Sequence, residues 1–126
     1  SLESERNAIT VIDTDPARLS LLQSRLDLRG VVGNGIQPSV QAEAGVADAD
    51  MFIACASQDE TNLVASKVAR EVHRVPTTVA RLRSPEFDEG SELLAASGFA
   101  VDHVLHPEQS VTRYVRKLIE YPEALQ

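Results

Sequence analysis

An acidic residue follows the first short apolar run of the sequence, at the point where a strand would end. The run Ala8–Ile12 is rich in β-branched residues, and Asp13 comes directly after it. Ligands of open α/β sheets bind beyond the carboxyl ends of the strands, so Asp13 could accept hydrogen bonds from the hydroxyl groups of a ribose. Asp15 and Pro16 are typical of a helix start, as N-cap and first helical residue. The alternative for Asp13 is a solvated carboxylate in a turn.

The second predicted strand ends in the flexible sequence Gly33-Asn34-Gly35. Glycines at this point would let a flat base approach the backbone, and Asn34 could cover one edge of that base. The alternative is an ordinary turn with left-handed backbone angles, for which Asn and Gly are the preferred residues. The residue types alone leave both interpretations open.

A third strand end is predicted at Ala56-Ser57, after the apolar run Met51–Cys55. Small residues before a helix N-terminus leave room for a phosphate or a ribose, because free backbone amides point outward there. Ser57 and Glu60 also have the spacing of a capping box, which would be present in either case. Within the apolar run, Cys55 is predicted to pack in the core as an inert side chain.

The fourth strand end carries two arginines. Arg81 and Arg83 are two residues apart on the strand expected over Thr77–Leu82, so their side chains should project to the same side. Two guanidinium groups aimed at one spot on an acidic protein suggest a bound phosphate. The alternative is an ion pair at the rim of the sheet with an acid such as Glu86 or Asp88.

Other kinds of chemistry find little support in the sequence. His103 and His106 have a spacing near that of a metal-binding pair, and Glu108 could add a ligand, but no cysteine lies near them. No Ser-His-Asp or Cys-His arrangement is suggested, and no Gly-x-Ser-x-Gly elbow occurs. We therefore predict neither catalytic residues nor a metal site.

Length, composition and charge narrow the class of protein. The 126 residues leave room for one domain, with 43% hydrophobic and 25% charged residues as in soluble globular proteins. A formal net charge of −7 argues against nucleic-acid binding, because phosphate contacts need a basic face. No apolar run approaches membrane-spanning length and no leader is visible, which predicts no membrane insertion. A single cysteine suits a reducing cytosol. A start at Ser1 suggests a fragment or a processed product.

The elements that must position these residues alternate between strand and helix. Residues 1–7 are polar and are interpreted as the tail of a helix or a loop. Short connections and this alternation predict a Rossmann-like α/β fold, a doubly wound parallel sheet with helices on both faces. The strands are expected at Ala8–Ile12, Val31–Val32, Met51–Ala54, Thr77–Leu82 and Val101–Leu105, and the helices at Pro16–Leu26, Pro38–Ala44, Ser57–His73, Ser84–Gly98 and from His106 to Pro122.

The sequence resembles the TrkA-N type of nucleotide-binding domain, the N-terminal half of the regulator-of-potassium-conductance (RCK) module in the regulatory subunits of bacterial Trk potassium uptake systems. The likeness runs through nearly all residues, and its most specific parts are Asp59-Glu60-Thr61-Asn62 and Arg81-Leu82-Arg83-Ser84-Pro85. Further blocks are Ile9–Asp15, Gly33–Gly35, Glu43–Gly45 with Asp48–Asp50, Asp102–Gln109 and Leu118–Pro122.

This resemblance implies a function and a set of partners. Domains of this family bind NAD(H) or adenine nucleotides such as ATP and ADP, and they signal to a membrane potassium channel or transporter. It implies that Asp13 holds the adenine ribose, that Ala56-Ser57 forms part of the nucleotide floor, and that Arg81, with Arg83, faces the phosphates. The final helix, Val111–Ile119, resembles a dimer-forming helix, although it could equally cover the sheet. The resemblance further implies a homodimer or a larger ring. It also implies a cytoplasmic protein that is held at the inner face of the membrane through its partner.

Two other classes of protein remain as alternatives to this non-enzymatic regulator. The first is the cofactor-binding domain of an NAD-dependent dehydrogenase, which needs a further catalytic domain that 126 residues cannot hold. The second is a module for protein interaction that binds no phosphate group. The sequence does not indicate which nucleotide is physiological or the direction of the regulation.

One departure from the family pattern affects the whole site. The family opens with a strand and a Gly-x-Gly-x-x-Gly turn, and this sequence starts inside the helix that follows them, so the first βα unit is missing and the domain over 1–126 is incomplete. In the usual strand order the missing strand lies between the Ile9 strand and the Met51 strand. The flanking strands could pair directly, a partner chain could cover them, or the natural protein could be longer. Without the glycine turn, nucleotide affinity is expected to be weak.

Overall fold

A computed structural model describes residues 8–120 of the chain. The predicted polar tail over 1–7 and the helix end at Pro122 lie outside these residues. The elements along the chain are β1 (Thr10–Asp13), α2 (Pro16–Arg25), β2 (Arg29–Val32), α3 (Pro38–Glu43), the 3-10 helix η1 (Val46–Asp48), β3 (Met51–Ala54), α4 (Asp59–His73), β4 (Thr77–Arg81), the 3-10 helix η2 (Glu92–Leu94), β5 (His103–Leu105) and α5 (Val111–Glu120).

The start of α2 and the end of α3 follow from local sequence. The Asp15 carboxylate accepts hydrogen bonds from the backbone N–H groups of Ala17 and Arg18, at 2.9 and 3.4 Å, and Pro16 is the first helical residue. These two contacts confirm the predicted N-cap. The chain leaves α3 through Gly45, whose φ of +83° lies in the left-handed region that glycine adopts without strain.

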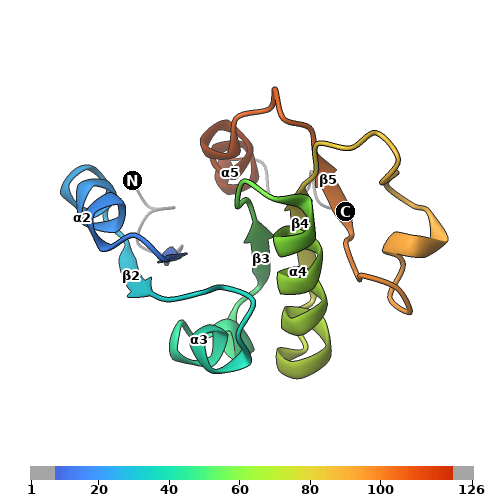
Figure 1. Ribbon diagram of the computed structural model, residues 1–126. Helices are drawn as coiled ribbons and strands as arrows, with labels where there is room; N and C mark the ends of the chain where they lie inside the picture. The colour runs from blue at the N-terminus through green and yellow to red at the C-terminus, as the bar shows by residue number, and fades with distance from the viewer. Residues whose placement is uncertain (1–7, 121–126) are drawn as a thin grey trace.

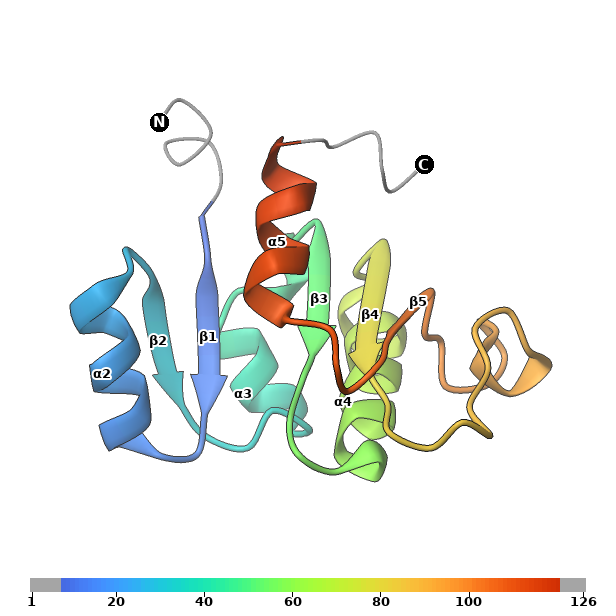
Figure 2. The same cartoon turned by 90° about the horizontal axis from the view of Figure 1, so that it is seen from above.

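The strands form two parallel sheets rather than one continuous sheet. β1 pairs with β2, from Thr10 opposite Arg29 to Asp13 opposite Val32. β3, β4 and β5 form the second sheet in that order, and β1 is not hydrogen-bonded to β3. The expected position of the missing strand is therefore a gap. Of the three possibilities considered for this position, direct pairing of β1 with β3 is wrong. Figures 1 and 2 show α2 and α5 on one side of the strands and α3 and α4 on the other.

Helix α4 holds the two sheets together through packing. Leu63 and Ala65 of α4 belong to a core cluster with residues of β3 and β4, at Ala54 and Ala80. One turn further along α4, the fully buried Ala69 belongs to a second cluster with Val31 of β2 and with Ala44, Val46 and Val75. The hydrophobic contacts of one helix with both clusters thus replace the hydrogen bonds that a continuous sheet would have.

Two predicted helices near the C-terminal end differ from the structure. No α-helix forms over Ser84–Gly98, where the chain makes turns and the short η2. Gly90 lies in one of these turns, and its φ of +84° cannot be part of a right-handed helix. The last helix begins at Val111 rather than near His106, after a turn closed by the hydrogen bond from the Gln109 N–H to the His106 carbonyl.

The predicted capping box at the start of α4 is also wrong. The helix begins at Asp59 with Gln58 as N-cap, one residue later than a cap at Ser57 requires, and no side chain caps it. The last strand is shorter than expected, beginning at His103 instead of Val101. Within residues 8–120, none of the helices is long and apolar enough to cross a membrane.

Candidate functional site

Asp13 is the last residue of β1 and lies at the edge of the gap between the two sheets. Its side chain is 16% exposed, and one carboxylate oxygen accepts a hydrogen bond of 2.9 Å from the Asp15 N–H. The other oxygen lies 3.8 Å from the guanidinium of Arg18, whose side chain is largely exposed. The carboxylate is therefore held in place, with one oxygen left to an exposed surface partner that a ligand hydroxyl could replace.

Arg81, at the end of β4, extends across the end of β3. Its Nη2 donates a hydrogen bond of 3.0 Å to the carbonyl oxygen of Cys55. The thiol of Cys55 has a raised pKa, chiefly because the surrounding protein desolvates it; the positive charge of Arg81 opposes this rise and the negative charge of Asp13 adds to it. Arg81 therefore reaches the backbone at the end of β3, the strand on the far side of the gap from Asp13.

The position of Cys55 corrects the sequence prediction. β3 ends at Ala54, so Cys55 lies beyond the strand and is exposed instead of packed in the core. Its raised pKa reflects protein atoms crowded around the sulfur, even though part of the residue remains open to solvent. The thiol of Cys55 is therefore neutral at physiological pH, and the backbone carbonyl of the same residue is the group that Arg81 binds.

The turn Gly33-Asn34-Gly35 follows β2 and is tied to the rest of the site through the backbone. Gly33 donates its N–H to the Asp13 carbonyl at 3.0 Å, and the Asn34 side chain accepts from the Ile36 N–H at 3.2 Å. Neither glycine has a positive φ, so a left-handed turn is not the reason for them. A Cβ at Gly33 would lie 2.9 Å from a methyl group of Val40, and close packing on α3 therefore requires glycine there.

The buried side-chain amide of Gln41 holds this turn in place through a hydrogen bond. Gln41 is completely buried, and its Nε2 donates to the carbonyls of Gly35 at 2.7 Å and Ala65 of α4 at 3.1 Å. Its Oε1 is buried without a hydrogen-bond partner. The sequence indicated no role for Gln41, because a polar residue in a short amphipathic helix is normally expected on the exposed face.

The turn at Ala56-Ser57 is exposed, but its amide is not free in the way the sequence suggested. The Ala56 N–H donates to Oδ1 of Asn62 at 2.8 Å, and the Ala56 carbonyl accepts from Nδ2 of the same side chain at 3.0 Å. Nδ2 also donates to the Arg81 carbonyl at 2.7 Å. Asn62 therefore joins two of the predicted strand ends. It appeared in the sequence only as part of a family-specific block.

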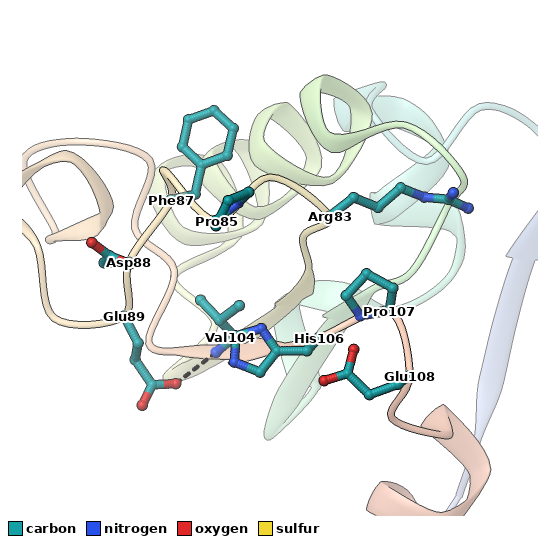
Figure 3. A pocket seen from close by; sticks show the side chains of 9 residues that line it. All are labelled: Arg83, Pro85, Phe87, Asp88, Glu89, Val104, His106, Pro107 and Glu108. Carbon is teal, nitrogen blue, oxygen red and sulfur yellow. Dashed lines mark hydrogen bonds between the residues drawn. The ribbon is translucent and has the colours of Figure 1, made fainter.

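Arg83 lies past the end of β4, so strand alternation does not fix its direction relative to Arg81. It lines an open pocket of about 750 Å³ at the end of β5, together with Pro85, Phe87, Asp88, Glu89, Val104, His106, Pro107 and Glu108 (Figure 3). Its side chain extends away from Phe87 and Asp88. Within residues 8–120, neither Arg81 nor Arg83 forms an ion pair, so the alternative of a rim pair with Glu86 or Asp88 is absent.

The far wall of this pocket contains a carboxylate that occupies the edge of the sheet. Glu89 accepts a hydrogen bond of 2.6 Å from the Val104 N–H of β5, drawn as a dashed line in Figure 3, and lies 3.8 Å from Nδ1 of His103. His103 is thus beside an acid rather than grouped with His106. In the part of the chain that the structure describes, no three His, Cys, Asp or Glu side chains are arranged to hold a metal ion.

Comparison with known proteins gives a family match over most of the chain. The family model of the TrkA-N domain matches residues 1–107. The Trk system potassium uptake protein TrkA of Vibrio alginolyticus is 46% identical over 127 residues, which cover 100% of this chain and 28% of that protein. The chain therefore spans little more than a quarter of this relative.

Solved structures of similar fold are more distant in sequence. The crystal structure of the TrkA-N domain of the inner membrane protein ybaL from Escherichia coli has a TM-score of 0.67 at 20% identity, covering 93% of this chain and 82% of that one. The GsuK channel bound to NAD has a TM-score of 0.65 at 24% identity, covering 82% of this chain and 18% of the channel. The same channel has also been solved bound to ADP, with a TM-score of 0.66 at 23% identity, covering 83% of this chain and 26% of that one. These likenesses establish a Rossmann-like fold.

Proposed function

We propose that this chain, which belongs to the TrkA-N domain family, is a nucleotide-binding regulatory domain of a potassium uptake system. The observation that carries the proposal is the position of Asp13 at the end of β1, beside the gap, together with the hydrogen bond of Arg81 to the backbone at the end of β3. An acid and an arginine at the carboxyl ends of parallel strands match the ribose hydroxyls and the phosphates of one nucleotide. The role of the longer protein, potassium uptake, is part of the proposal because the chain spans 28% of its relative.

Each candidate side chain takes a distinct part in this proposal. Asp13 accepts hydrogen bonds from the ribose, Arg81 and Arg83 face the phosphates, and the turn Ala56-Ser57 forms the floor. The turn Gly33-Asn34-Gly35 receives the base along its backbone. NAD(H), ATP and ADP all contain the adenosine and phosphate groups that these positions would bind, and the related channel GsuK has been solved with NAD and with ADP.

The gap between β1 and β3 is proposed to take one more parallel strand, followed by a glycine-rich turn. Because β1 and β3 do not pair with each other, the backbone groups on their facing edges receive no ladder hydrogen bonds across the gap. The domain over 1–126 is thus proposed to be a single nucleotide-binding domain that lacks its first βα unit. The turn after that strand would place backbone amides on the pyrophosphate, which residues 8–120 do not supply.

We expect this polypeptide alone to bind nucleotides more weakly than the full-length protein. Titration of the 126-residue chain with ATP and NADH by calorimetry should give dissociation constants well above the micromolar range. A version that includes a strand and glycine turn upstream should bind more tightly. Micromolar binding by the short chain would contradict the expectation and show that its four strand ends suffice.

Replacing Arg81 with alanine in the full-length protein is expected to weaken ATP or NADH binding about tenfold or more, since one charge-assisted hydrogen bond to a phosphate is lost. Calorimetric titration measures this change. The matched control is Arg25→Ala, which removes an arginine at the end of α2. This position lies shortly before the start of β2 and away from the strand ends that carry the candidate site. Unchanged affinity in Arg81→Ala would favour a module that binds no phosphate group.

The domain is proposed to regulate transport without catalysing a reaction. Nucleotide would bind better to one arrangement of a homodimer or ring than to another, and contacts with a membrane potassium channel or transporter subunit would report the difference. The protein would then be cytoplasmic, peripheral at the inner face of the membrane through this partner. Co-purification of the full-length protein with the transporter subunit tests the contact. Hydride transfer from NADH to a small carbonyl compound would instead favour a dehydrogenase.

A further inference from the structure

Two side chains of α4, three residues apart, bind the backbone of both turns that carry candidate phosphate ligands. The Asp59 carboxylate accepts hydrogen bonds from the N–H groups of Arg83 at 2.8 Å and Ser84 at 3.0 Å. Asn62, which is 2% exposed, binds the backbone of Ala56 through two hydrogen bonds and that of Arg81 through one. Residues at i and i+3 lie on the same face of a helix, so both side chains reach in the same direction.

We infer that Asp59 and Asn62 are positioning residues of the nucleotide site. They hold the turn after β3 and the segment after β4 in one fixed relation, so that Ala56-Ser57, Arg81 and Arg83 move as a single unit. This inference rests on the proposed function. It adds two residues that touch no ligand themselves and act through the backbone of those that do.

The charge of Asp59 separates this role from a direct electrostatic one. A carboxylate near bound phosphates repels them, so removing its charge should by itself strengthen the binding of an anionic nucleotide. A carboxylate that fixes the Arg83 and Ser84 amides has the opposite effect when it is weakened, because the segment carrying Arg83 loses its fixed position. The sign of the change in affinity therefore distinguishes the two roles.

The experiment compares Asp59→Asn with Glu60→Gln in the full-length protein. Both substitutions remove one negative charge from the first turn of α4, but the side chain of Glu60 is exposed and makes no hydrogen bond or ion pair within residues 8–120. Calorimetric titration with ATP is expected to give roughly tenfold weaker binding for Asp59→Asn. Binding by Glu60→Gln should be unchanged or slightly tighter. Amide hydrogen exchange without nucleotide should become faster at Arg83 and Ser84 only in Asp59→Asn.

The possible outcomes separate this inference from the proposed function. Equal or tighter ATP binding by Asp59→Asn, relative to Glu60→Gln, would overturn the inference while leaving the nucleotide site in place. A lower unfolding temperature of Asp59→Asn without any change in ATP affinity would show a merely structural role and would also overturn it. Failure of the unsubstituted full-length protein to bind ATP, ADP or NADH would overturn the proposed function, and the inference with it.

Discussion

Replacing Asn62 with aspartate is expected to lower the free energy of unfolding by about 3–5 kcal/mol at neutral pH. The substitution keeps the shape of the side chain but exchanges the NH₂ donor for an oxygen. That oxygen would face the carbonyls of Ala56 and Arg81, at distances of 3.0 and 2.7 Å in the structure, with no hydrogen between them. The site is 2% exposed, so water cannot solvate the new charge.

The loss of stability in Asn62→Asp should depend on pH in a defined direction. Burial and the two carbonyls favour the neutral acid, so the pKa of the introduced carboxyl is higher in the folded than in the unfolded protein. Stability is therefore lost as the pH rises above the unfolded-state pKa, until it levels off above the folded-state pKa, and the variant is closest to the unsubstituted protein in acid. Urea denaturation of both proteins at neutral and mildly acidic pH measures the difference.

Asn34→Asp is the matched control for this substitution. Asn34 is exposed and uses only its Oδ1, which accepts from the Ile36 N–H and which aspartate also supplies. Its stability should change by no more than about 0.5 kcal/mol, as for most surface substitutions. If Asn62→Asp lowered the free energy of unfolding as little as Asn34→Asp, the three hydrogen bonds of Asn62 would not stabilise the fold.

Replacing Gly98 with alanine is expected to destabilise the protein by about 3 kcal/mol or more. A Cβ at this position would lie 2.0 Å from the carbonyl oxygen of Leu93 and 2.7 Å from its carbon. The same oxygen accepts a hydrogen bond of 2.8 Å from the Phe99 N–H, so the backbone cannot move aside without breaking this contact. Chemical denaturation monitors the loss of stability.

Substitutions at two other glycines distinguish a steric clash of the added Cβ from strain in the backbone conformation. Gly90 has a φ of +84° and no atom within 4 Å of an added Cβ, so Gly90→Ala should cost only about 1–2 kcal/mol from the left-handed conformation. Gly35 has neither a positive φ nor a contact closer than 3.8 Å, and Gly35→Ala should leave stability within about 1 kcal/mol. The expected order of destabilisation is Gly98, Gly90, Gly35. A Gly98 variant as stable as the Gly35 variant would contradict the packing seen around η2.

The sequence predicted those parts of the fold that depend on local chemistry. The Asp15-Pro16 cap, the glycine that ends α3, and the strand Met51–Ala54 all follow from short-range preferences, and the structure contains each of them. The resemblance to a known family added the position of the gap between β1 and β3. Neither propensity nor spacing alone could have located it.

The predictions that failed depend on contacts between distant residues. Ser57 and Glu60 had the spacing of a capping box, but α4 begins at Asp59, whose carboxylate binds the backbone after β4 instead. Cys55 looked like a core residue because it follows an apolar run, yet β3 ends one residue before it. The segment over 84–98 was expected to form a helix, but the backbone turns at Gly90, whose φ of +84° lies outside the right-handed helical region.

Residues of the candidate site could be identified from their types and positions in the sequence, but the residues that hold them in place could not. Asp13 and Arg81 were identified from their positions at strand ends, whereas the hydrogen bond from Arg81 to the Cys55 carbonyl depends on the pairing of β4 with β3. Their roles toward a nucleotide stay predictions. Gln41 and Asn62 were missed as supports because a single sequence does not reveal which amides are buried.

The hydrogen bond between Glu89 and Val104 has a consequence for the growth of the sheet. A strand adding to the outer edge of β5 would need the Val104 N–H, which the Glu89 carboxylate already occupies. The negative charge would also repel an approaching acidic chain of the same kind, a device by which natural edges avoid aggregation. The outer edge of β5 is thus protected from further pairing, whereas β1 and β3 are unpaired with each other across the gap, and an added strand is expected there.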